Sequence, residues 1–328
     1  MKSIYILIIA LFVFSICHIK AQDTFSIVCA DSSTRQVGSA GASCVDLIAF
    51  GITDASFLSD IFPDSGAINT QAAYQPGNQE NARFRMREGD TPEQIIEFIK
   101  THDIEDNPEI RQYGIAGFIG KKAVSAGFTG TNCIDYKQHI TGSVQGIAYS
   151  IQGNILLGKH ILDSMESRFR STNGSIVCRL MAALQGAKVI GADTRCAANN
   201  SSSLFAFVKV AKPTDSYGKP SIFESYITYN GEMVEPIDEL QKIIDDKIGC
   251  STTFIKDHDK AYNNVFPNPA EQRISFAKAY NFVSLRSLLG NEIIHNNNAS
   301  QTLDISAIPN GIYMLITDTM LEKIIIQH

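Results

Sequence analysis

The stretch TFSIVCA, residues 24–30, begins the globular part of this 328-residue chain and decides how it folds. Its residues alternate in polarity and are rich in strand formers, a pattern that is typical of a β-strand. The turn formers Asp-Ser-Ser at 31–33 follow, and RQVG at 35–38 begins a second strand. The sequence therefore predicts an N-terminal β-hairpin whose first strand starts at Thr24.

The pattern continues in alternating groups of strands and helices. Asp90 and Thr91 provide an N-cap ahead of Pro92, and apolar residues then recur at helical spacing. Further strands are predicted at 66–72, 113–119, 123–129, 147–155, 204–210 and 222–229, and helices at 90–101, 158–169, 176–184 and 236–248. This grouping predicts an α+β fold, a layered sandwich with helices outside two sheets.

The chain changes character after Cys250. A polar linker at 251–264 separates the first domain, 22–250, from short alternating segments that fill residues 265–328. Turn formers, such as Pro-Asn-Gly at 309–311, separate these segments. The pattern predicts a small C-terminal β-sandwich.

Residues 1–21 have the layout of a cleavable signal peptide. Lys2 precedes an apolar run from Ile4 to Cys17, which is shorter than the ~20 residues that span a bilayer, and the small residue Ala21 stands at the cleavage position. An uncleaved N-terminal anchor is the alternative. No later segment is apolar enough to cross a membrane, so we expect an exported protein without a stable membrane span.

The net charge and the cysteines of the chain exclude some classes of function. Removing residues 1–21 takes away Lys2 and Lys20, so 26 basic residues face 34 acidic ones and the net charge is −8. This charge argues against nucleic-acid binding. Six cysteines remain, which allow 15 pairings as three disulfides, and two or more buried thiols are the alternative. Their spacing does not match a zinc site, and the sequence leaves open whether the chain forms oligomers.

The C-terminal segment closely resembles the type A sorting domain of the type IX secretion system of Bacteroidetes. The resemblance rests on FPNP at 266–269, LDIS at 303–306, PNGIY at 309–313 and EKIII at 322–326. It implies that residues 265–328 engage the type IX secretion machinery. The protein would then pass through the periplasm and the outer membrane and be secreted or attached to the cell surface.

The first domain resembles domain of unknown function 1028, a family similar in fold to the N-terminal nucleophile hydrolases. The matching blocks, in order, are TFSIV at 24–28, GAINTQA at 66–72, QYGI at 112–115, TGTNC at 129–133, HITG at 139–142, IQGNIL at 151–156 and GADTRC at 191–196. The resemblance implies a four-layer αββα sandwich, although the family has no assigned reaction.

In an N-terminal nucleophile hydrolase the first residue supplies a hydroxyl or thiol, and its free α-amine, with a pKa near ~7.7, acts as the base. Thr24 stands at the matching position. Cleavage after Ala21 leaves Gln22 and Asp23 ahead of it, so activity requires a second cut. Alternatively, Thr24 is a structural residue at the start of an edge strand. Ser26 and Cys29 are weaker nucleophile candidates because they lie within the strand.

Four side-chain amides are candidates for the lining of a pocket. Asn69 and Gln71 share one face of their strand, and Gln152 and Asn154 are related in the same way, because side chains alternate with period two. Amide N–H groups can stabilise a developing oxyanion. Alternatively, these amides satisfy backbone groups between the sheets.

Three further residues carry chemistry. Asp193 and Arg195 could orient a substrate carboxylate or the nucleophile's amine, or they could form an ordinary turn ion pair. His139 could act as an acid or base, or as a structural residue near a turn. No phosphate loop, HExxH or GxSxG is present. We therefore expect no cofactor and no metal.

The leading hypothesis is an exported hydrolase of linear amide bonds, acting on small peptides or cell-wall-derived material with Thr24 as the nucleophile. The alternative is a secreted, non-catalytic protein that uses the same pocket to bind a peptide or glycan. A surface protein without a small-molecule site, stabilised by disulfides, is the third reading.

Overall fold

The computed structural model describes residues 24–250, 265–287, 291–298, 300–317 and 321–328. The chain divides into two compact units near residue 252. The predicted signal peptide, residues 1–21, and the predicted linker, residues 251–264, lie outside the described residues.

The N-terminal unit contains a six-stranded antiparallel sheet in the order β10-β9-β2-β1-β8-β7. The six strands are β1 (Thr24–Asp31), β2 (Val37–Ser43), β7 (Gln138–Val144), β8 (Ile147–Gly153), β9 (Phe205–Ala211) and β10 (Ile222–Ile227). The predicted hairpin is present as β1 and β2, with Thr24 opposite Ser43. Because β1 is paired on both sides, Thr24 does not begin an edge strand, and that part of the structural alternative was wrong.

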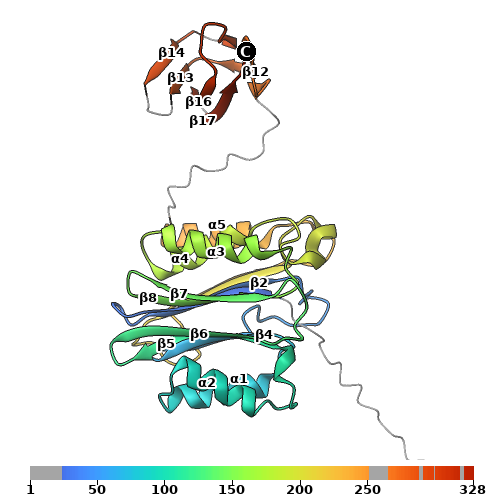
Figure 1. The fold of residues 1–328 in the computed structure, drawn as a ribbon, viewed down its shortest axis with the longest axis vertical. Helices are drawn as coiled ribbons and strands as arrows, with labels where there is room; N and C mark the ends of the chain where they lie inside the picture. The colour runs from blue at the N-terminus through green and yellow to red at the C-terminus, as the bar shows by residue number, and fades with distance from the viewer. Residues whose placement is uncertain (1–23, 251–264, 288–290, 299, 318–320) are drawn as a thin grey trace, which may run out of the picture. The chain divides into compact units, whose positions relative to one another are not determined.

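A second, four-stranded sheet has the order β3-β4-β5-β6. Its strands are β3 (Ser59–Phe62), β4 (Gly66–Ala72), β5 (Arg111–Ile119) and β6 (Lys122–Thr129). The two sheets lie face to face, with β1 packed against β4 and β5 (Figure 1). The space between the sheets is therefore lined by one face of β1.

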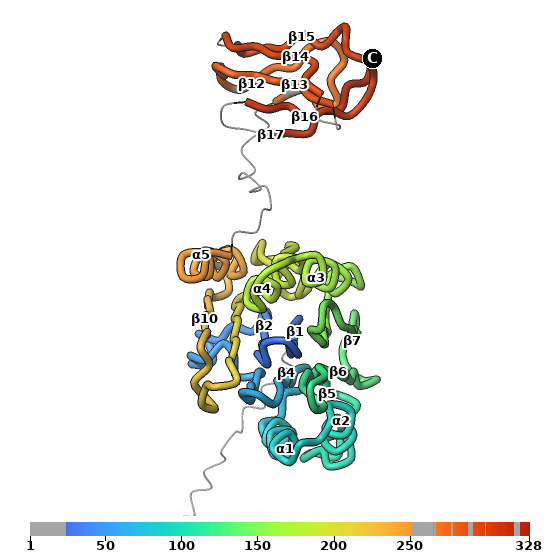
Figure 2. Tube along the Cα trace, turned by 90° about the vertical axis from the view of Figure 1, so that its left-hand side faces the viewer, coloured from blue at the N-terminus to red at the C-terminus, as the bar shows by residue number. Residues whose placement is uncertain are grey.

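Helices cover the outer face of each sheet. Helices α3 (Lys159–Ser171), α4 (Ile176–Ala187) and α5 (Pro236–Ile248) lie on the six-stranded sheet, and α1 (Pro76–Arg87) and α2 (Pro92–Thr101) lie on the four-stranded sheet (Figures 1 and 2). Two short 3-10 helices, η1 (Pro108–Ile110) and η2 (Thr194–Asn199), lie in connections. The layers run helix, sheet, sheet, helix, and the predicted mixed α+β class with more than one sheet is confirmed.

Helix α2 begins where its sequence predicts. The Thr91 hydroxyl accepts from the backbone N–H of Gln94, and the Gln94 side chain accepts from the backbone N–H of Thr91, a capping box. Helix α1 was not predicted, because its sequence PGNQENARFRMR offers little apolar periodicity and buries mainly Ala82 and Met86 of its hydrophobic residues. Strands β3 and β7 were also missed, since one is short and the other is largely polar.

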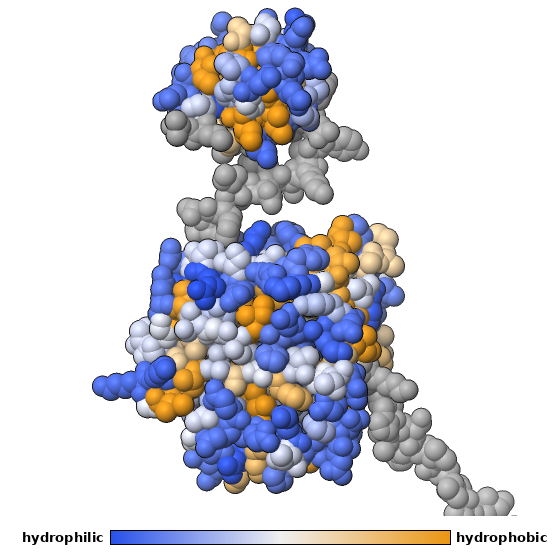
Figure 3. Space-filling model, viewed as in Figure 1, coloured by the Kyte–Doolittle hydropathy of each residue, from blue (hydrophilic) through white to orange (hydrophobic). Residues whose placement is uncertain are grey.

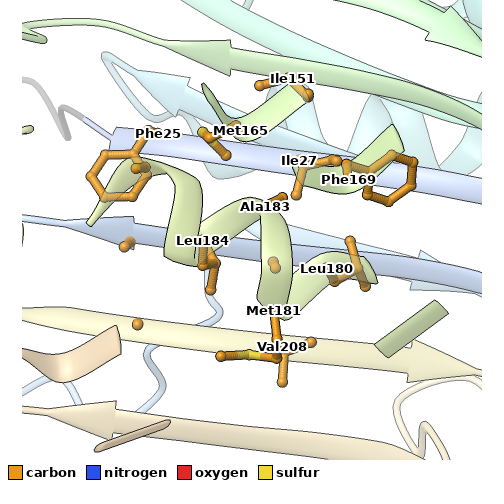
Figure 4. Packing of buried hydrophobic residues seen from close by; sticks show 14 of the residues in the cluster. Phe25, Ile27, Ile151, Met165, Phe169, Leu180, Met181, Ala183, Leu184 and Val208 are labelled. Atoms are coloured by element: carbon orange, nitrogen blue, oxygen red, sulfur yellow. The ribbon is translucent and has the colours of Figure 1, made fainter. Parts of the chain in front are cut away.

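The main hydrophobic core lies between the six-stranded sheet and helices α3 and α4 (Figure 4). Phe25 and Ile27 of β1 pack there, with Met165 and Leu180 from the helices. Burying a side chain of this size contributes roughly 1.5–3 kcal/mol. Because side chains alternate along β1, Ser26 and its neighbours of the same parity face the other sheet instead.

The C-terminal unit has two small sheets around one core, in agreement with the predicted β-sandwich. Strands β11 (Val265–Phe266), β12 (Arg273–Tyr280) and β15 (Ser300–Asp304) form one, and β13 (Val283–Ser287), β14 (Glu292–Asn296), β16 (Gly311–Thr317) and β17 (Leu321–Ile326) form the other. Ile274, Leu285 and Leu315 are fully buried in the core they share.

The surface of the N-terminal unit seen in Figure 3 is mostly hydrophilic, with small separate groups of hydrophobic side chains. Val189 and Ile190, which follow α4, are among the exposed hydrophobic residues of this unit. None of the helices in the described ranges is long and apolar enough to cross a membrane.

Candidate active site

Thr24 is completely buried at the start of β1. Alternation along the strand places its side chain on the same face as Ser26, toward the four-stranded sheet. Its backbone carbonyl accepts two hydrogen bonds, from Gln71 Nε2 at 2.9 Å and from the backbone N–H of Asn154 at 3.2 Å. Both sheets therefore hold Thr24 in position.

Ser26 joins the two sheets directly. Its hydroxyl donates to Gln71 Oε1 at 2.6 Å and accepts from Gln152 Nε2 at 2.7 Å. All three side chains are buried. Gln71 and Gln152, two of the predicted pocket residues, come from different sheets and meet beside Thr24. The Ser26 hydroxyl is already used by these bonds, which argues against Ser26 as a nucleophile.

Gln112 on β5 is the centre of the network and was not among the predicted site residues. Its Oε1 accepts from Gln71 Nε2 at 2.7 Å and from Asn154 Nδ2 at 3.0 Å, and its Nε2 donates to the backbone carbonyl of Gly153 at 2.9 Å. The signal in the sequence that could have identified it is a glutamine within a largely apolar strand, because such a side chain needs hydrogen-bond partners once it is buried.

Asn154 carries the one unsatisfied acceptor of this network. Its Nδ2 bonds Gln112, but its Oδ1 is buried without a hydrogen-bond partner among the described residues. An unpaired buried polar atom costs about 1–3 kcal/mol. Because the backbone of Asn154 is itself bonded to Thr24, this acceptor lies at the same end of the sheets as the candidate nucleophile.

Asn69 shares the face of Gln71 on β4, as expected from their spacing, but it lies one pleat further from Thr24. Its Oδ1 accepts from the Ser39 hydroxyl at 2.7 Å, and its Nδ2 donates to the carbonyl of Ile27 at 3.3 Å. Asn69 therefore joins the sheets without contacting the amides around Thr24.

Two glycines allow the sheets to approach this closely. A Cβ atom built on Gly114 would lie 1.9 Å from Gln152 Oε1, and one on Gly127 would lie 2.5 Å from Cδ2 of His139. Neither position has room for a larger residue while Gln152 and His139 keep their places. The glycines thus create the space that the polar side chains fill.

Asp193 and Arg195 lie at the Thr24 end of the six-stranded sheet. The backbone N–H of Cys44, next to the Ser43 that pairs with Thr24, donates to Asp193 Oδ2 at 2.9 Å. Arg195 donates to both carboxylate oxygens of Asp193, from Nε at 3.0 Å and Nη2 at 2.7 Å. Asp193 is fully buried, whereas a third of the Arg195 side chain is exposed.

A disulfide between Cys44 and Cys196 fastens this ion pair to β2. A second disulfide joins Cys178 on α4 to Cys250. The other two cysteines of the described chain, Cys29 and Cys133, are buried thiols. The six cysteines therefore form two disulfides and leave two thiols, so each of the two alternatives predicted from the sequence holds in part. Burial, with the nearby charge of Asp31 as the next cause, raises the pKa of Cys29, which disfavours the thiolate that a cysteine nucleophile needs.

His139 lies within β7 rather than beside a turn. Its Nδ1 is 2.9 Å from the Thr129 hydroxyl, which also accepts from Gln112 Nε2. Burial lowers the pKa of His139, so the ring is neutral at pH 7. His139 is therefore joined to Gln112 through the Thr129 hydroxyl.

Thr24 and the amides beside it are buried, and three clefts on the described surface are lined by other residues. No group of three or more metal-ligating side chains occurs within the part of the chain that the structure covers. What Thr24 has around it is a set of fixed amide dipoles, which can orient a reacting group or stabilise charge.

Comparisons with known proteins identify the two parts of the chain. Residues 24–220 match a family of unknown function, DUF1028, and residues 264–327 match a secretion system C-terminal sorting domain. The chain is also similar to the crystal structure of protein SPO2555 from Silicibacter pomeroyi, assigned to DUF1028: identity is 21%, the TM-score is 0.51, and the match covers 68% of this chain and 88% of that one. No curated protein matches the chain significantly.

Proposed function

The chain belongs to DUF1028, a family of unknown function, and we propose that it is a secreted hydrolase of linear amide bonds with Thr24 as its nucleophile. Its C-terminal domain is a secretion system sorting domain of the type IX system, so the protein interacts with that machinery and is secreted or held at the cell surface. The sorting domain thus accounts for the export of the protein, and the hydrolysis of amide bonds is what we propose.

The observation that carries the proposal is the position of Thr24. It is the first residue of an interior strand, and its side chain is expected to face the space between the sheets. Amide groups of both sheets bond its carbonyl, and others bond the neighbouring Ser26. We assign the helix–sheet–sheet–helix order to the four-layer fold of the N-terminal nucleophile hydrolases, in which the first residue of such a strand reacts.

The proposed reaction requires that the residues ahead of Thr24 be removed. Signal cleavage after Ala21 leaves two of them, and a second cut between Asp23 and Thr24 converts the Thr24 nitrogen from an amide into a free amine. The Asn154 Oδ1 acceptor, unsatisfied among the described residues, is a suitable partner for an N–H of that amine.

In the first step the Thr24 Oγ attacks the carbonyl carbon of the substrate while the α-amine accepts the hydroxyl proton. The C–O bond forms, the carbonyl oxygen becomes an oxyanion, and N–H donors stabilise its charge. The C–N bond then breaks as the ammonium returns the proton to the leaving amine. Water hydrolyses the resulting ester, which releases the acid and restores Thr24.

Arg195 suits a role in substrate binding. Asp193 orients its guanidinium through Nε and Nη2, a third of the side chain is exposed, and a guanidinium is a group that binds the carboxylates that peptides carry. This favours peptides and related acyl amino acids with a free carboxylate over uncharged amides.

Gln71 bonds Gln112 directly and is linked to Gln152 through the Ser26 hydroxyl. This internal bonding favours a second candidate function, a peptide- or glycan-binding protein that does not react with its ligand. In that case the amides would serve only to join the sheets, and the residues ahead of Thr24 would stay in place.

Mass spectrometry of the secreted protein distinguishes the two. A mature chain that starts at Thr24 is expected for the hydrolase, and one that starts at Gln22 is expected for the binding protein. Turnover of a panel of N-acyl amino acids and short peptides should then disappear in Thr24→Ala and persist, with a changed rate, in Thr24→Ser. Unchanged turnover in Thr24→Ala would exclude Thr24 from the mechanism.

A further inference from the structure

A cleft of about 320 Å³ lies where strand β3 of one sheet meets strand β9 of the other, with helix α1 and the loop between β9 and β10 at its rim. Figure 2 shows that this loop extends to the level of the four-stranded sheet. Neither Thr24 nor the amides around it line the cleft, so it is separate from the proposed active site.

Two unusual polar groups line the cleft. The Ser59 hydroxyl is buried without a hydrogen-bond partner among the described residues, and Ser59 as a whole is only 6% exposed. The Lys209 ammonium lies 3.1 Å from the Ser59 carbonyl oxygen, to which it donates. Both residues line the same cleft, and a hydroxyl and an ammonium can each donate to an anionic group.

The charges around the cleft limit what that anion can be. Four charged side chains line it, two acidic (Asp54 and Asp60) and two basic (Arg83 and Lys209), so their sum is neutral. Arg83 and Asp60 neutralise each other at 2.6 Å. Lys209 and Asp54 are left, and neither forms an ion pair with another residue that the structure describes.

This balance disfavours a polyanion such as phosphate, because the carboxylates of Asp54 and Asp60 would repel it. It favours a ligand that carries one negative and one positive group, with the anion at Lys209 and the cation at Asp54. Tyr217 and Phe223, each 43% exposed, add aromatic surface to the same cleft. Aromatic faces bind apolar groups and cations.

From this geometry we propose that the cleft between β3 and β9 binds a free α-amino acid with an apolar side chain as its zwitterion. Lys209 and the Ser59 hydroxyl bind its carboxylate, Asp54 binds its ammonium, and Tyr217 and Phe223 contact its side chain. The site is independent of the reaction proposed for Thr24, and binding does not require that reaction.

The electrostatics of Lys209 agree with this role. Burial lowers its pKa, and the charges of Asp54 and Asp60 oppose the shift. A bound carboxylate would add to the effect of these two charges and favour the charged form of the ammonium further.

Isothermal titration of the full-length mature protein with L-phenylalanine tests the proposal. We expect saturable binding that weakens at least about tenfold for phenylalaninamide, which lacks the carboxylate, and for N-acetylphenylalanine, which lacks the ammonium. Inorganic phosphate should bind more weakly than the amino acid. Tighter binding of phosphate, or equal binding of the blocked compounds, would overturn the assignment of a zwitterion.

Variants locate the site. Lys209→Met and Ser59→Ala should each weaken L-phenylalanine binding, the first by about tenfold or more. The matched control is Lys212→Met, an exposed lysine just past the end of β9, which should bind as the unmodified protein does. Thermal melts verify that each variant is folded. Absence of saturable binding, or binding unchanged in folded Lys209→Met, would exclude the site, and Thr24→Ala should bind normally whether or not the protein is a hydrolase.

Discussion

The side-chain amide of Gln71 donates a 2.9 Å hydrogen bond to the backbone carbonyl of Thr24. One sheet thereby fixes the first residue of the central strand of the other sheet. Because Gln71 also bonds Ser26 and Gln112, the position of Thr24 depends on a network that is closed to solvent.

The pH dependence of turnover should report the amine of Thr24. If the free α-amine is the base, kcat/KM should rise with pH through about 7.7, since only the neutral amine accepts a proton. His139 should not contribute to this rise, because burial lowers its pKa and the ring is already neutral there. A pH series on the unmodified protein and on His139→Gln measures this. A rise that is lost in His139→Gln would assign the base to the histidine.

Gly114→Ala should disrupt the contact between the sheets. The added Cβ would lie 1.9 Å from Gln152 Oε1, so Gln152 must move and its bond to the Ser26 hydroxyl must lengthen or break. We expect a loss of about 1–3 kcal/mol in the free energy of unfolding. In a Gln152→Ala background the same substitution should cost less, and urea denaturation of the four proteins measures the coupling. Additive costs would contradict this cause.

The two disulfides should differ in their effect on activity. Replacing both Cys44 and Cys196 by Ala removes a link between residues 152 apart and should destabilise the protein by about 2–5 kcal/mol. It should also lower turnover, because the link holds Asp193 and Arg195 beside the strand end that pairs with Thr24.

Replacing Cys178 and Cys250 provides the matched control, because that link joins α4 to the end of the N-terminal unit. It should lower the melting temperature and leave kcat/KM nearly unchanged under conditions where the variant is folded. Equal loss of turnover in both double variants would show that the Cys44–Cys196 link has no special role at the site.

Asp103 should make the free energy of unfolding depend on pH in the acidic range. Burial by itself would raise its pKa, but the hydrogen bonds from Arg111, Asn78 and the backbone lower it to about 2. The folded-state pKa is thus below the unfolded value of about 3.9, so this stabilisation is present above pH 4 and is lost as pH falls toward 2.

Asp103→Asn leaves the buried Arg111 guanidinium without its main carboxylate and should cost about 3–5 kcal/mol at pH 7. The difference in unfolding free energy between the variant and the unmodified protein should shrink between pH 4 and pH 2. Glu97→Gln, which removes only an exposed ion pair with Lys100, is the control and should change stability by less than about 1 kcal/mol. A difference that is constant with pH would contradict the assignment to Asp103.

Local patterns in the sequence determined much of the secondary structure. The alternation of residues 24–30 and the turn at 31–33 were enough for the hairpin, because both act between neighbours in the chain. The capping residues Thr91 and Gln94 set the start of α2 for the same reason. Short segments were also enough to identify the family and the sorting tail, because each is recognised by several such segments in a fixed order. GADTRC at 191–196 is one of the segments of the family, and PNGIY at 309–313 is one of the segments of the tail.

Tertiary structure decided the rest, because it depends on residues far apart in the chain. Gln112 took a central role only when β5 was packed against β1, and Cys44 could be matched with Cys196 only after both reached one end of a sheet. The cleft between β3 and β9 requires Ser59 and Lys209 to meet across 150 residues. Period-two alternation says which face a side chain takes, but only the packing of two sheets says what that face touches.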